Sequence, residues 1–224
     1  MNKETFKAVD KYYEDLLLDD NPLFEQINHN AAAAGLPTIQ VSPLQGKFLQ
    51  LMVQVQGSRR VLEIGTLGGY STAWLASGLP PDGLLITLEL EEMHAEIARK
   101  NLDPFNFQPE IKILVGDGLQ LITEMISTGT EPFDLIFIDA DKEQYAEYLD
   151  GAVNLSRPGT FIIADNVVRN GKILEQDSKD SSIVGIQRFN QRLLNNPGLD
   201  ATTIQTVGAR SYDGFSLIVV KGDG

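Results

Sequence analysis

The chain has 224 residues, contains no cysteine, and carries 18 Lys and Arg against 31 Asp and Glu, giving a formal charge of −13. The lack of cysteine excludes disulfides, thiolate metal ligands and cysteine nucleophiles, and the acidic balance disfavours nucleic acid as a partner. The N-terminus lacks the apolar core of a signal peptide, and no apolar run approaches the roughly 20 residues of a membrane span. We therefore expect a cytoplasmic protein without a membrane segment. Because no linker or internal repeat divides the chain, a single domain over residues 1–224 is predicted.

Amphipathic segments precede the first expected strand. Residues 3–18 and 22–34 carry apolar side chains at helical spacing. Ser42 and Pro43 suit the N-cap and the first position of a third helix. The N-terminal helices, within residues 1–40, are expected to form a substrate lid or a dimer contact, with plain helical packing as the alternative.

The central motif is VLEIGTLGGYS, at residues 61–71. Its apolar start suits a buried parallel strand, its glycines allow a tight turn close to a ligand, and helical spacing begins at Tyr70. A strand, a glycine turn and a helix in this order typically build a cofactor site at the C-terminal edge of an open α/β sheet. The spacing of Glu63, Gly65 and Gly68 differs from the G-x-G-x-x-G of dinucleotide binding. It resembles the first motif of the S-adenosylmethionine (SAM) methyltransferases.

Strands alternate with helices after this motif. The expected strands lie at 84–89, 111–117, 133–139 and 159–165, and the expected helices at 94–103, 119–126 and 143–153. This alternation predicts right-handed βαβ units. A helix at 181–196 is followed by two strand-like runs, 201–207 and 214–221, joined through turn residues at 212–214. The predicted fold is α/β, a Rossmann-like class I SAM-dependent methyltransferase fold with helices on both faces of a seven-stranded, mostly parallel sheet that has one antiparallel strand.

Two positions near strand ends suit a nucleotide cofactor. Glu89 ends the second expected strand, where a carboxylate can accept hydrogen bonds from both ribose hydroxyls. A solvated strand-end acid is the alternative, and ribose recognition alone does not separate SAM from NAD. Gly118, after the third strand, would let the backbone approach an adenine ring closely.

Three oxygen ligands are expected to converge at one edge of the sheet. Asp139 ends the fourth strand and Asp165 the fifth, and neighbouring parallel strands lie about 4.8 Å apart. With the amide oxygen of Asn166 they form a hard site suited to Mg²⁺, or to Mn²⁺ or Ca²⁺. A cation would offset the repulsion between the two carboxylates. Helix capping is the alternative; it fits Asp141 better, since residues 141–144 have the form of a capping box.

Lys142 lies in the expected first turn of the next helix, where the helix macrodipole disfavours a cation. Beside a metal ion and a sulfonium cofactor, positive neighbours would favour its neutral amine, which suits a general base. The alternative is a surface lysine offset by nearby acids.

The strings VLEIGTLGGYS, FIDADKEQY and IIADNVVRNG resemble the cation-dependent O-methyltransferases, the family of catechol and caffeoyl-CoA O-methyltransferases, and especially their small bacterial members. The resemblance runs from about Val41 to Val220. It implies metal ligands at Asp139, Asp165 and Asn166, with a catalytic lysine at Lys142. It further implies SAM contacts from Val41, Glu63, Gly65, Thr66, Ser71, Glu89, Gly118 and Asp139, a catalytic contribution from Asp139, and substrate contacts from Lys142 and Asn170.

The implied reaction is methyl transfer from SAM to a hydroxyl of a catechol-like acceptor, such as a caffeoyl or flavonoid compound, with S-adenosylhomocysteine (SAH) as the product. Mg²⁺ is the implied cation, and a homodimer is the implied assembly. The loop at 166–182 and the N-terminal helices are expected to set specificity. Ser216 departs from the pattern, because animal catechol enzymes have a substrate-binding glutamate after the Asp-Gly-Leu of their last strand.

Three other functions stay open at this stage. Relatives of the same fold methylate a hydroxylated uridine in tRNA, which the acidic charge and the lack of a basic stripe disfavour. An NAD(P)-dependent oxidoreductase is disfavoured by the glycine spacing. A non-catalytic SAM-binding module is disfavoured by the presence of Asp139, Lys142, Asp165 and Asn166 together.

Overall fold

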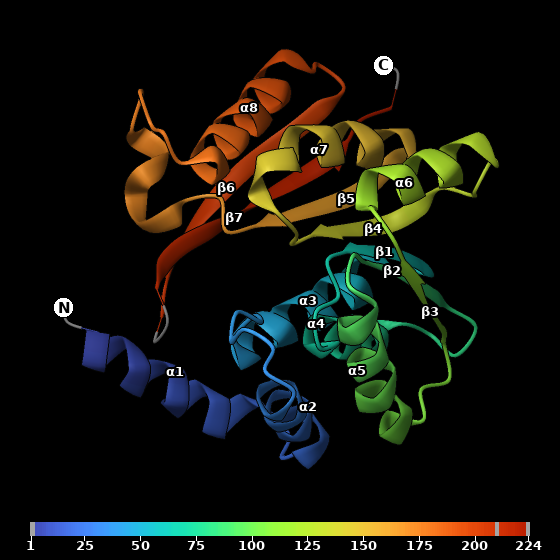
Figure 1. Cartoon of the computed structure of the whole chain (residues 1–224), viewed down its shortest axis with the longest axis vertical. Helices are drawn as coiled ribbons and strands as arrows, with labels where there is room; N and C mark the ends of the chain where they lie inside the picture. Colours follow the sequence, from blue (N-terminus) through green and yellow to red (C-terminus); the bar gives the residue numbers. More distant parts are fainter. Residues whose placement is uncertain (1–2, 209–210, 223–224) are drawn as a thin grey trace. The chain divides into compact units, whose positions relative to one another are not determined.

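The computed structural model describes residues 3–208 and 211–222. By internal contacts, the chain divides into two compact units, one made of Val9–Gly118 and the other of Met1–Ala8 with Leu119–Gly224. Both combine strands and helices, as Figure 1 shows. The single domain expected from the sequence stays a prediction. Within the described ranges, every helix is too short or too polar to cross a membrane.

The unit of Val9–Gly118 contains three parallel strands in the order β3-β2-β1. Its helix α3 begins at Pro43, and the Ser42 side chain accepts a hydrogen bond from the backbone N–H of Gln45 at 3.2 Å, as the sequence predicted. The helix α1, Lys3–Leu17, starts in the other unit. The remaining elements are α2 Pro22–Ala33, α3 Pro43–Gln56, β1 Arg60–Ile64, α4 Tyr70–Gly78, β2 Leu84–Glu89, α5 Glu92–Leu102, the 3-10 helix η1 Asp103–Phe105, and β3 Glu110–Val115.

Aromatic side chains pack α2 against α4 in this unit. The ring of Phe24 stacks on Trp74 with centroids 4.0 Å apart, and meets Tyr70 and Phe105 edge-on at 5.9 and 5.1 Å. Aromatic pairs of this geometry add stability beyond the area that they bury. The second N-terminal helix therefore has a packing role in the fold.

The other unit contains four strands in the order β4-β5-β7-β6. β5 runs parallel to β4, whereas β7 runs antiparallel to both β5 and β6. The predicted seven-stranded, mostly parallel sheet with one antiparallel strand is confirmed. The elements are α6 Gly118–Ser127, β4 Phe133–Ile138, η2 Lys142–Gln144, α7 Tyr145–Asn154, β5 Ser156–Asp165, η3 Arg169–Leu174, α8 Ser181–Asn195, β6 Leu199–Val207 and β7 Tyr212–Val220.

Two local predictions are wrong. Residues 212–214 do not form the turn between the last two strands; they open β7, where Asp213 pairs with Thr206 of β6. Residues 141–144 do not form a capping box, since the Asp141 side chain makes no capping hydrogen bond. Its carboxylate instead accepts a hydrogen bond from the Tyr148 hydroxyl at 2.7 Å, and α7 begins only at Tyr145. In both cases a contact with a residue outside the expected turn or cap engages an acid that has strong turn and cap propensities.

Candidate active site

The two predicted metal-ligand carboxylates follow neighbouring strands. Ile138 of β4 is paired with Ala164 of β5. Asp139 and Asp165 are the next residues on these two parallel strands, so they lie at the same level of the sheet. Strands in such a pair lie about 4.8 Å apart. The side chain of Asp139 is 21% exposed, whereas Asp165 is buried. The register of β4 and β5 thus brings the two acids to one edge of the sheet.

Asn166 begins a loop with unusual backbone angles. Its φ is 64°, and its backbone N–H donates to Oδ1 of Asp165 at 2.8 Å. Arg169 and Asn170 are also left-handed, with φ of 54° and 56°. Non-glycine residues rarely adopt this conformation, and they do so where the surrounding structure holds them. A tight, strained loop therefore leads from the carboxylates to Asn170.

Asp213 of β7 holds this loop in place. Its buried carboxylate accepts hydrogen bonds through Oδ1 from the backbone N–H groups of Val168, Arg169 and Gly214, at 3.1, 2.9 and 3.0 Å. The N–H of Val167 donates to the carbonyl of Gly214 at 2.9 Å. A Cβ at Gly214 would lie 2.7 Å from the side chain of Val168, so only glycine lets the loop approach β7 this closely. This role of Asp213 is not visible in the local sequence, which is typical of a turn.

Lys142 lies in η2, beside Asp139. Its Nζ donates to Oδ1 of Asp139 at 2.7 Å and to the hydroxyl of Tyr145 at 2.5 Å, and its side chain is 10% exposed. Gly185 of α8 packs directly on the backbone of this turn, where a Cβ would clash with the Lys142 carbonyl oxygen and lie 2.7 Å from Cα of Glu143. The lysine is therefore a largely sheltered residue paired with a predicted site carboxylate, and its role as a base stays a prediction.

Tyr145 is a member of the site that sequence reasoning missed. Its ring is fully buried, and its hydroxyl lies 2.8 Å from the Asp165 carbonyl and 3.1 Å from the Ile138 carbonyl. Burial, and then the carboxylates of Asp139 and Asp165, raise the pKa of Tyr145 well above its usual value, so the hydroxyl stays protonated at neutral pH. The available signal was its position three residues after Lys142, which suits a contact within one helical turn.

The donor set around Asp139 and Asp165 fits an oxygen-preferring divalent cation. Two carboxylates and the amide of Asn166 are hard ligands of the kind that Mg²⁺ selects. Across the described ranges, no group of three or more His, Cys, Asp or Glu side chains could hold a metal ion. The candidate set contains only two acids, so its third protein ligand would be an amide.

The glycine turn after β1 has the expected form. Gly65 and Gly69 have φ of 104° and 84°, and Leu67 between them is left-handed at 50°. Gly69 precedes the first residue of α4 and supplies no side-chain cap. A Cβ at Gly68 would lie 3.1 Å from Cβ of Ala31 in α2. The turn therefore brings bare backbone to the start of a helix, which suits binding of a polar ligand group.

Glu63 and Thr66 direct their side chains into the interior of this unit. Oε2 of Glu63 accepts hydrogen bonds from the hydroxyls of Thr72 at 2.5 Å and Thr87 at 2.7 Å. The Thr66 hydroxyl lies 2.6 Å from that of Thr87 and 3.1 Å from the Leu88 carbonyl. These buried hydrogen bonds stabilise the strands and the helix that flank the glycine turn. Glu63 and Thr66 therefore have a structural role that was not expected from the sequence.

Glu89 ties the end of β2 to the glycine turn. Its carboxylate accepts hydrogen bonds from the backbone N–H groups of Leu67 at 2.7 Å and Glu91 at 3.0 Å, and Nδ1 of His94 lies 3.3 Å away. The carboxylate predicted to bind the ribose thus lies next to the turn predicted to bind the cofactor.

The other predicted SAM contacts in this unit are Val41, buried ahead of α3, Ser71, half-buried in the first turn of α4, and Gly118, the first residue of α6.

Ser216, at which the sequence departs from the glutamate of the animal catechol enzymes, has its hydroxyl engaged inside the sheet. It is fully buried in β7, and its Oγ lies 2.9 Å from that of Thr203 on β6. Its hydroxyl therefore takes part in strand pairing.

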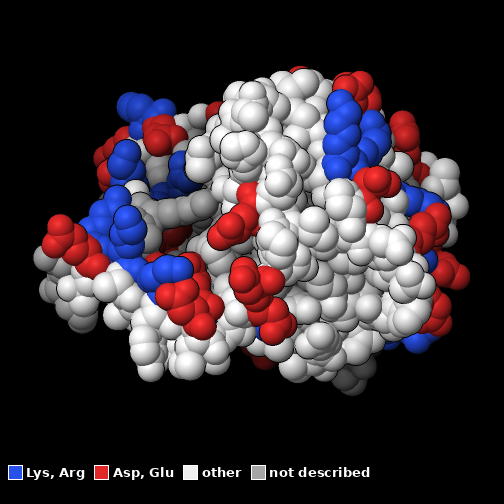
Figure 2. All heavy atoms as spheres, turned by 90° about the horizontal axis from the view of Figure 1, so that it is seen from below, with Lys and Arg blue, Asp and Glu red and all other residues white. Residues whose placement is uncertain are grey.

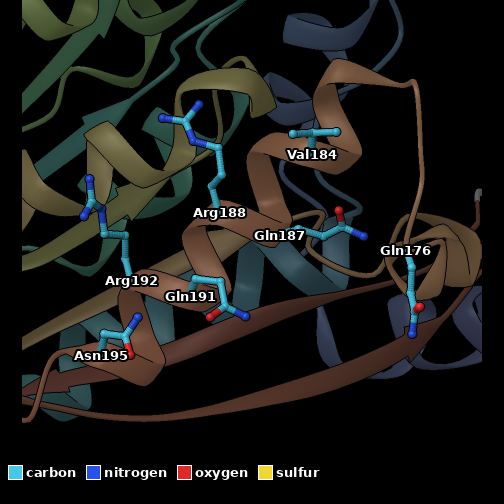
Figure 3. Close-up of a pocket in the computed structure, with 7 residues that line it drawn as sticks. All are labelled: Gln176, Val184, Gln187, Arg188, Gln191, Arg192 and Asn195. Atoms are coloured by element: carbon cyan, nitrogen blue, oxygen red, sulfur yellow. The ribbon is translucent and has the colours of Figure 1, made fainter.

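A surface groove runs along α8 (Figure 3). Arg188 and Arg192 in it form ion pairs with Glu147 and Asp150 of α7, which lies beside α8. The residues that line it are Gln176, Val184, Gln187, Arg188, Gln191, Arg192 and Asn195, and none of them is a predicted site residue. On the face in Figure 2, Lys and Arg side chains occur next to Asp and Glu side chains.

Comparison with known proteins gives the class of this fold, that of the SAM-dependent O-methyltransferases. The chain belongs to the O-methyltransferase family, whose sequence model matches residues 14–219. A catechol O-methyltransferase of Niastella koreensis is 47% identical over 222 residues, covering 99% of this chain and all of the relative. The predicted family and enzyme class are confirmed.

Two solved O-methyltransferases match the whole fold. One, from Bacillus cereus in complex with SAH, has a TM-score of 0.96 and 48% identity, and the match covers 98% of this chain and 100% of that one. The other, TomG from Streptomyces achromogenes in complex with SAM and involved in tomaymycin synthesis, has a TM-score of 0.95 and 40% identity, with 99% and 100% covered. These matches confirm the predicted fold class.

Proposed function

We propose that the protein transfers a methyl group from SAM to one hydroxyl of a vicinal dihydroxy aromatic compound, with the help of a divalent cation. The observation that carries the proposal is the sheltered Lys142 amine at 2.7 Å from Asp139, next to the buried Asp165. A base beside two carboxylates that would hold a cation suits the deprotonation of an acceptor hydroxyl. The relative named as a catechol O-methyltransferase supports the choice of acceptor.

The glycine turn and Glu89 are proposed to hold the cofactor, which would supply an electrophilic methyl group on sulfur. Glu89 is already fixed by the N–H groups of Leu67 and Glu91, so its carboxylate would be oriented before the ribose hydroxyls bind. The backbone at Gly65 and Gly118 would allow close approach of the ligand. Relatives solved with SAM and SAH support this assignment.

Asp139, Asp165 and Asn166 are proposed to hold the cation, Mg²⁺ in the first instance. When bound, it would make the acceptor hydroxyl more acidic. The N–H of Asn166 holds Oδ1 of Asp165 at 2.8 Å, which restricts that carboxylate. Asp213 would fix the loop on which Asn166 lies.

Lys142 is proposed as the general base. Its neutral amine would take the proton from the hydroxyl that accepts the methyl group, and the resulting ammonium ion would be stabilised by Asp139. The oxygen left with the negative charge then forms the new bond to carbon as the carbon–sulfur bond breaks, which gives the methyl ether and SAH. Asn170 and the loop at 166–182 would orient the acceptor, because Ser216 cannot supply the carboxylate found in the animal catechol enzymes.

The test is SAH release from SAM with catechol or caffeate as acceptor, first with Mg²⁺ and then with excess EDTA. We expect turnover that EDTA abolishes and Mg²⁺ restores. Calorimetry of SAM binding with and without EDTA gives a readout independent of turnover. Turnover that persists in EDTA overturns the cation's role; SAM binding without turnover on any catechol overturns the acceptor class and directs the search to tRNA.

A matched pair of variants tests the metal ligands. Asp165→Asn should lower turnover about 100-fold and raise the Mg²⁺ concentration needed for half-maximal rate, because a carboxylate ligand is lost. Asp200→Asn, on an exposed position of β6, removes the same charge away from the site and should change neither. Equal effects of the two substitutions would contradict the assignment.

A homodimer is proposed from the surface of α1. None of its described residues is buried, although Val9, Tyr12, Tyr13, Leu16 and Leu17 are large and apolar, with exposures of 44–62%. Exposed apolar helix faces commonly mark interfaces. Light scattering should give twice the chain mass, and Leu16→Glu should reduce it; a monomer in the wild type contradicts the proposal.

A further inference from the structure

The hydroxyl of Tyr145 connects the proposed base to the ends of the two strands that carry the carboxylates. It lies 2.5 Å from Nζ of Lys142, 2.8 Å from the carbonyl of Asp165 and 3.1 Å from the carbonyl of Ile138. We propose that Tyr145 is a positioning residue that aims the lone pair of Lys142 at the acceptor hydroxyl. This inference rests on the proposed function of Lys142 as the base.

The directions of these hydrogen bonds follow from the groups involved. A lysine ammonium can only donate, so the tyrosine oxygen accepts from Lys142. The single hydroxyl proton of Tyr145 is then left for a backbone carbonyl, and the shorter distance favours that of Asp165. Both carbonyls belong to residues at the ends of paired strands. The Tyr145 oxygen that accepts the hydrogen bond from Lys142 is therefore itself hydrogen-bonded to the end of the sheet.

The ring of Tyr145 has no freedom to move the hydroxyl away. It is completely buried at the start of α7 and meets the ring of Phe189 from α8 edge-on, with centroids 5.8 Å apart. The Nζ of Lys142 lies 4.6 Å from the centre of the Tyr145 ring, on the side of the hydroxyl that accepts its hydrogen bond. The immobile ring thus presents the hydroxyl to the amine as a fixed acceptor.

The neutral amine of Lys142, which is the form that acts as a base, is oriented by these two hydrogen-bond partners. A neutral amine has two N–H bonds and one lone pair in tetrahedral directions. If one N–H donates to Asp139 and the other to Tyr145, the lone pair must point away from both. Without the Tyr145 hydroxyl, the amine can rotate about its terminal bond, and the lone pair loses its fixed direction.

Tyr145→Phe removes the hydroxyl and keeps the ring. We expect kcat to fall about 10- to 100-fold, in line with the cost of misplacing a catalytic group, while KM for SAM stays within about twofold. Tyr148→Phe is the matched control, because Tyr148 is also buried in α7 and its hydroxyl donates at 2.7 Å to Asp141. A kcat for Tyr145→Phe equal to that of Tyr148→Phe overturns the inference.

A double-mutant cycle separates positioning from general destabilisation. Tyr145→Phe should slow the wild type but leave Lys142→Met unchanged, because a residue that acts through Lys142 has no effect once the lysine is gone. Losses that multiply overturn the inference. If Lys142→Met is inactive while Tyr145→Phe is normal, only the positioning role fails; if Lys142→Met is fully active, the base role and the positioning role fail together.

A structural readout needs no turnover. In crystals of Tyr145→Phe, the amine of Lys142 should leave its place beside Asp139 or occupy more than one position. An amine with unchanged, single placement in that variant overturns the inference whatever the assays give.

Discussion

The carboxylate of Asp213 accepts a hydrogen bond at 2.9 Å from the backbone N–H of Arg169, 44 residues earlier in the chain. Through this bond and a second one to Val168, the last strand of the sheet fixes the loop that follows the β5 carboxylate. The conformation of a loop with several left-handed residues thus depends on an acid that lies in a different strand.

Asp213→Ala should release this loop. Buried N–H groups without an acceptor cost about 1–3 kcal/mol each. Water that enters the space left by the carboxylate would satisfy some of them, so the free energy of unfolding should fall by about 1–3 kcal/mol in total. Hydrogen exchange at the amides of Val168 and Arg169 should become faster, and KM for the acceptor should rise. Asp200→Ala, exposed on β6, is the control and should leave exchange unchanged. Slow exchange retained in Asp213→Ala would show that the carboxylate does not hold the loop.

Gly185→Ala should disturb the turn that carries Lys142. The added methyl group would meet the backbone of Lys142 and Glu143, and overpacking of this kind typically costs about 1–3 kcal/mol. We expect a lower midpoint in urea unfolding and a lower kcat with little change in SAM affinity. Val184→Ala, one residue earlier and partly exposed, is the comparison. A normal kcat in Gly185→Ala would mean that η2 can shift without cost.

Thr87→Val should weaken the interior below the glycine turn. Valine keeps the shape of threonine but takes one hydroxyl away from the buried Glu63 and from Thr66. Leaving a buried polar group without its hydrogen-bond partner costs about 1–3 kcal/mol, and calorimetry should show weaker SAM binding. Thr202→Val, exposed on β6, should have little effect on either quantity. Equal stabilities of the two variants would argue against a role for Thr87 in supporting Glu63.

The raised pKa of Tyr145 predicts a loss of stability in alkaline solution. Its folded-state pKa lies above the unfolded value of 10.0, mainly because of burial and then because of Asp139 and Asp165. The contribution is fully present below pH 10; above it, the unfolded chain releases the proton first, so stability falls by at most about 1.4 kcal/mol per pH unit. Urea unfolding of the EDTA-treated protein between pH 9 and 11 should show a shallower decline in Tyr145→Phe than in the wild type or in the exposed Tyr12→Phe. Identical slopes in all three proteins would contradict the prediction.

Local sequence patterns were sufficient to predict the fold. Ser42 and Pro43 start a helix through contacts within four residues, and apolar runs followed by glycine or aspartate gave the strand positions. Asp139 and Asp165 could be placed at one sheet edge because parallel strands in sequence-adjacent βαβ units put their carboxyl ends together. The roles of these residues toward a cation and a substrate stay predictions.

Only the tertiary structure decided which groups hold the site residues. Asp213 and Asp141 have strong local preferences for turns and caps. The carboxylate of Asp213 is instead engaged by the distant loop at 168–169, and that of Asp141 by the Tyr148 hydroxyl on the following helix. Tyr145 reads in the sequence as an ordinary apolar position of α7, and its hydroxyl finds the carbonyls of Ile138 and Asp165 only when β4 and β5 are paired. The spacing of apolar residues along the chain predicts which side chains are buried. The orientation of a buried polar side chain depends on its hydrogen-bond partners, which come close only when the chain is folded.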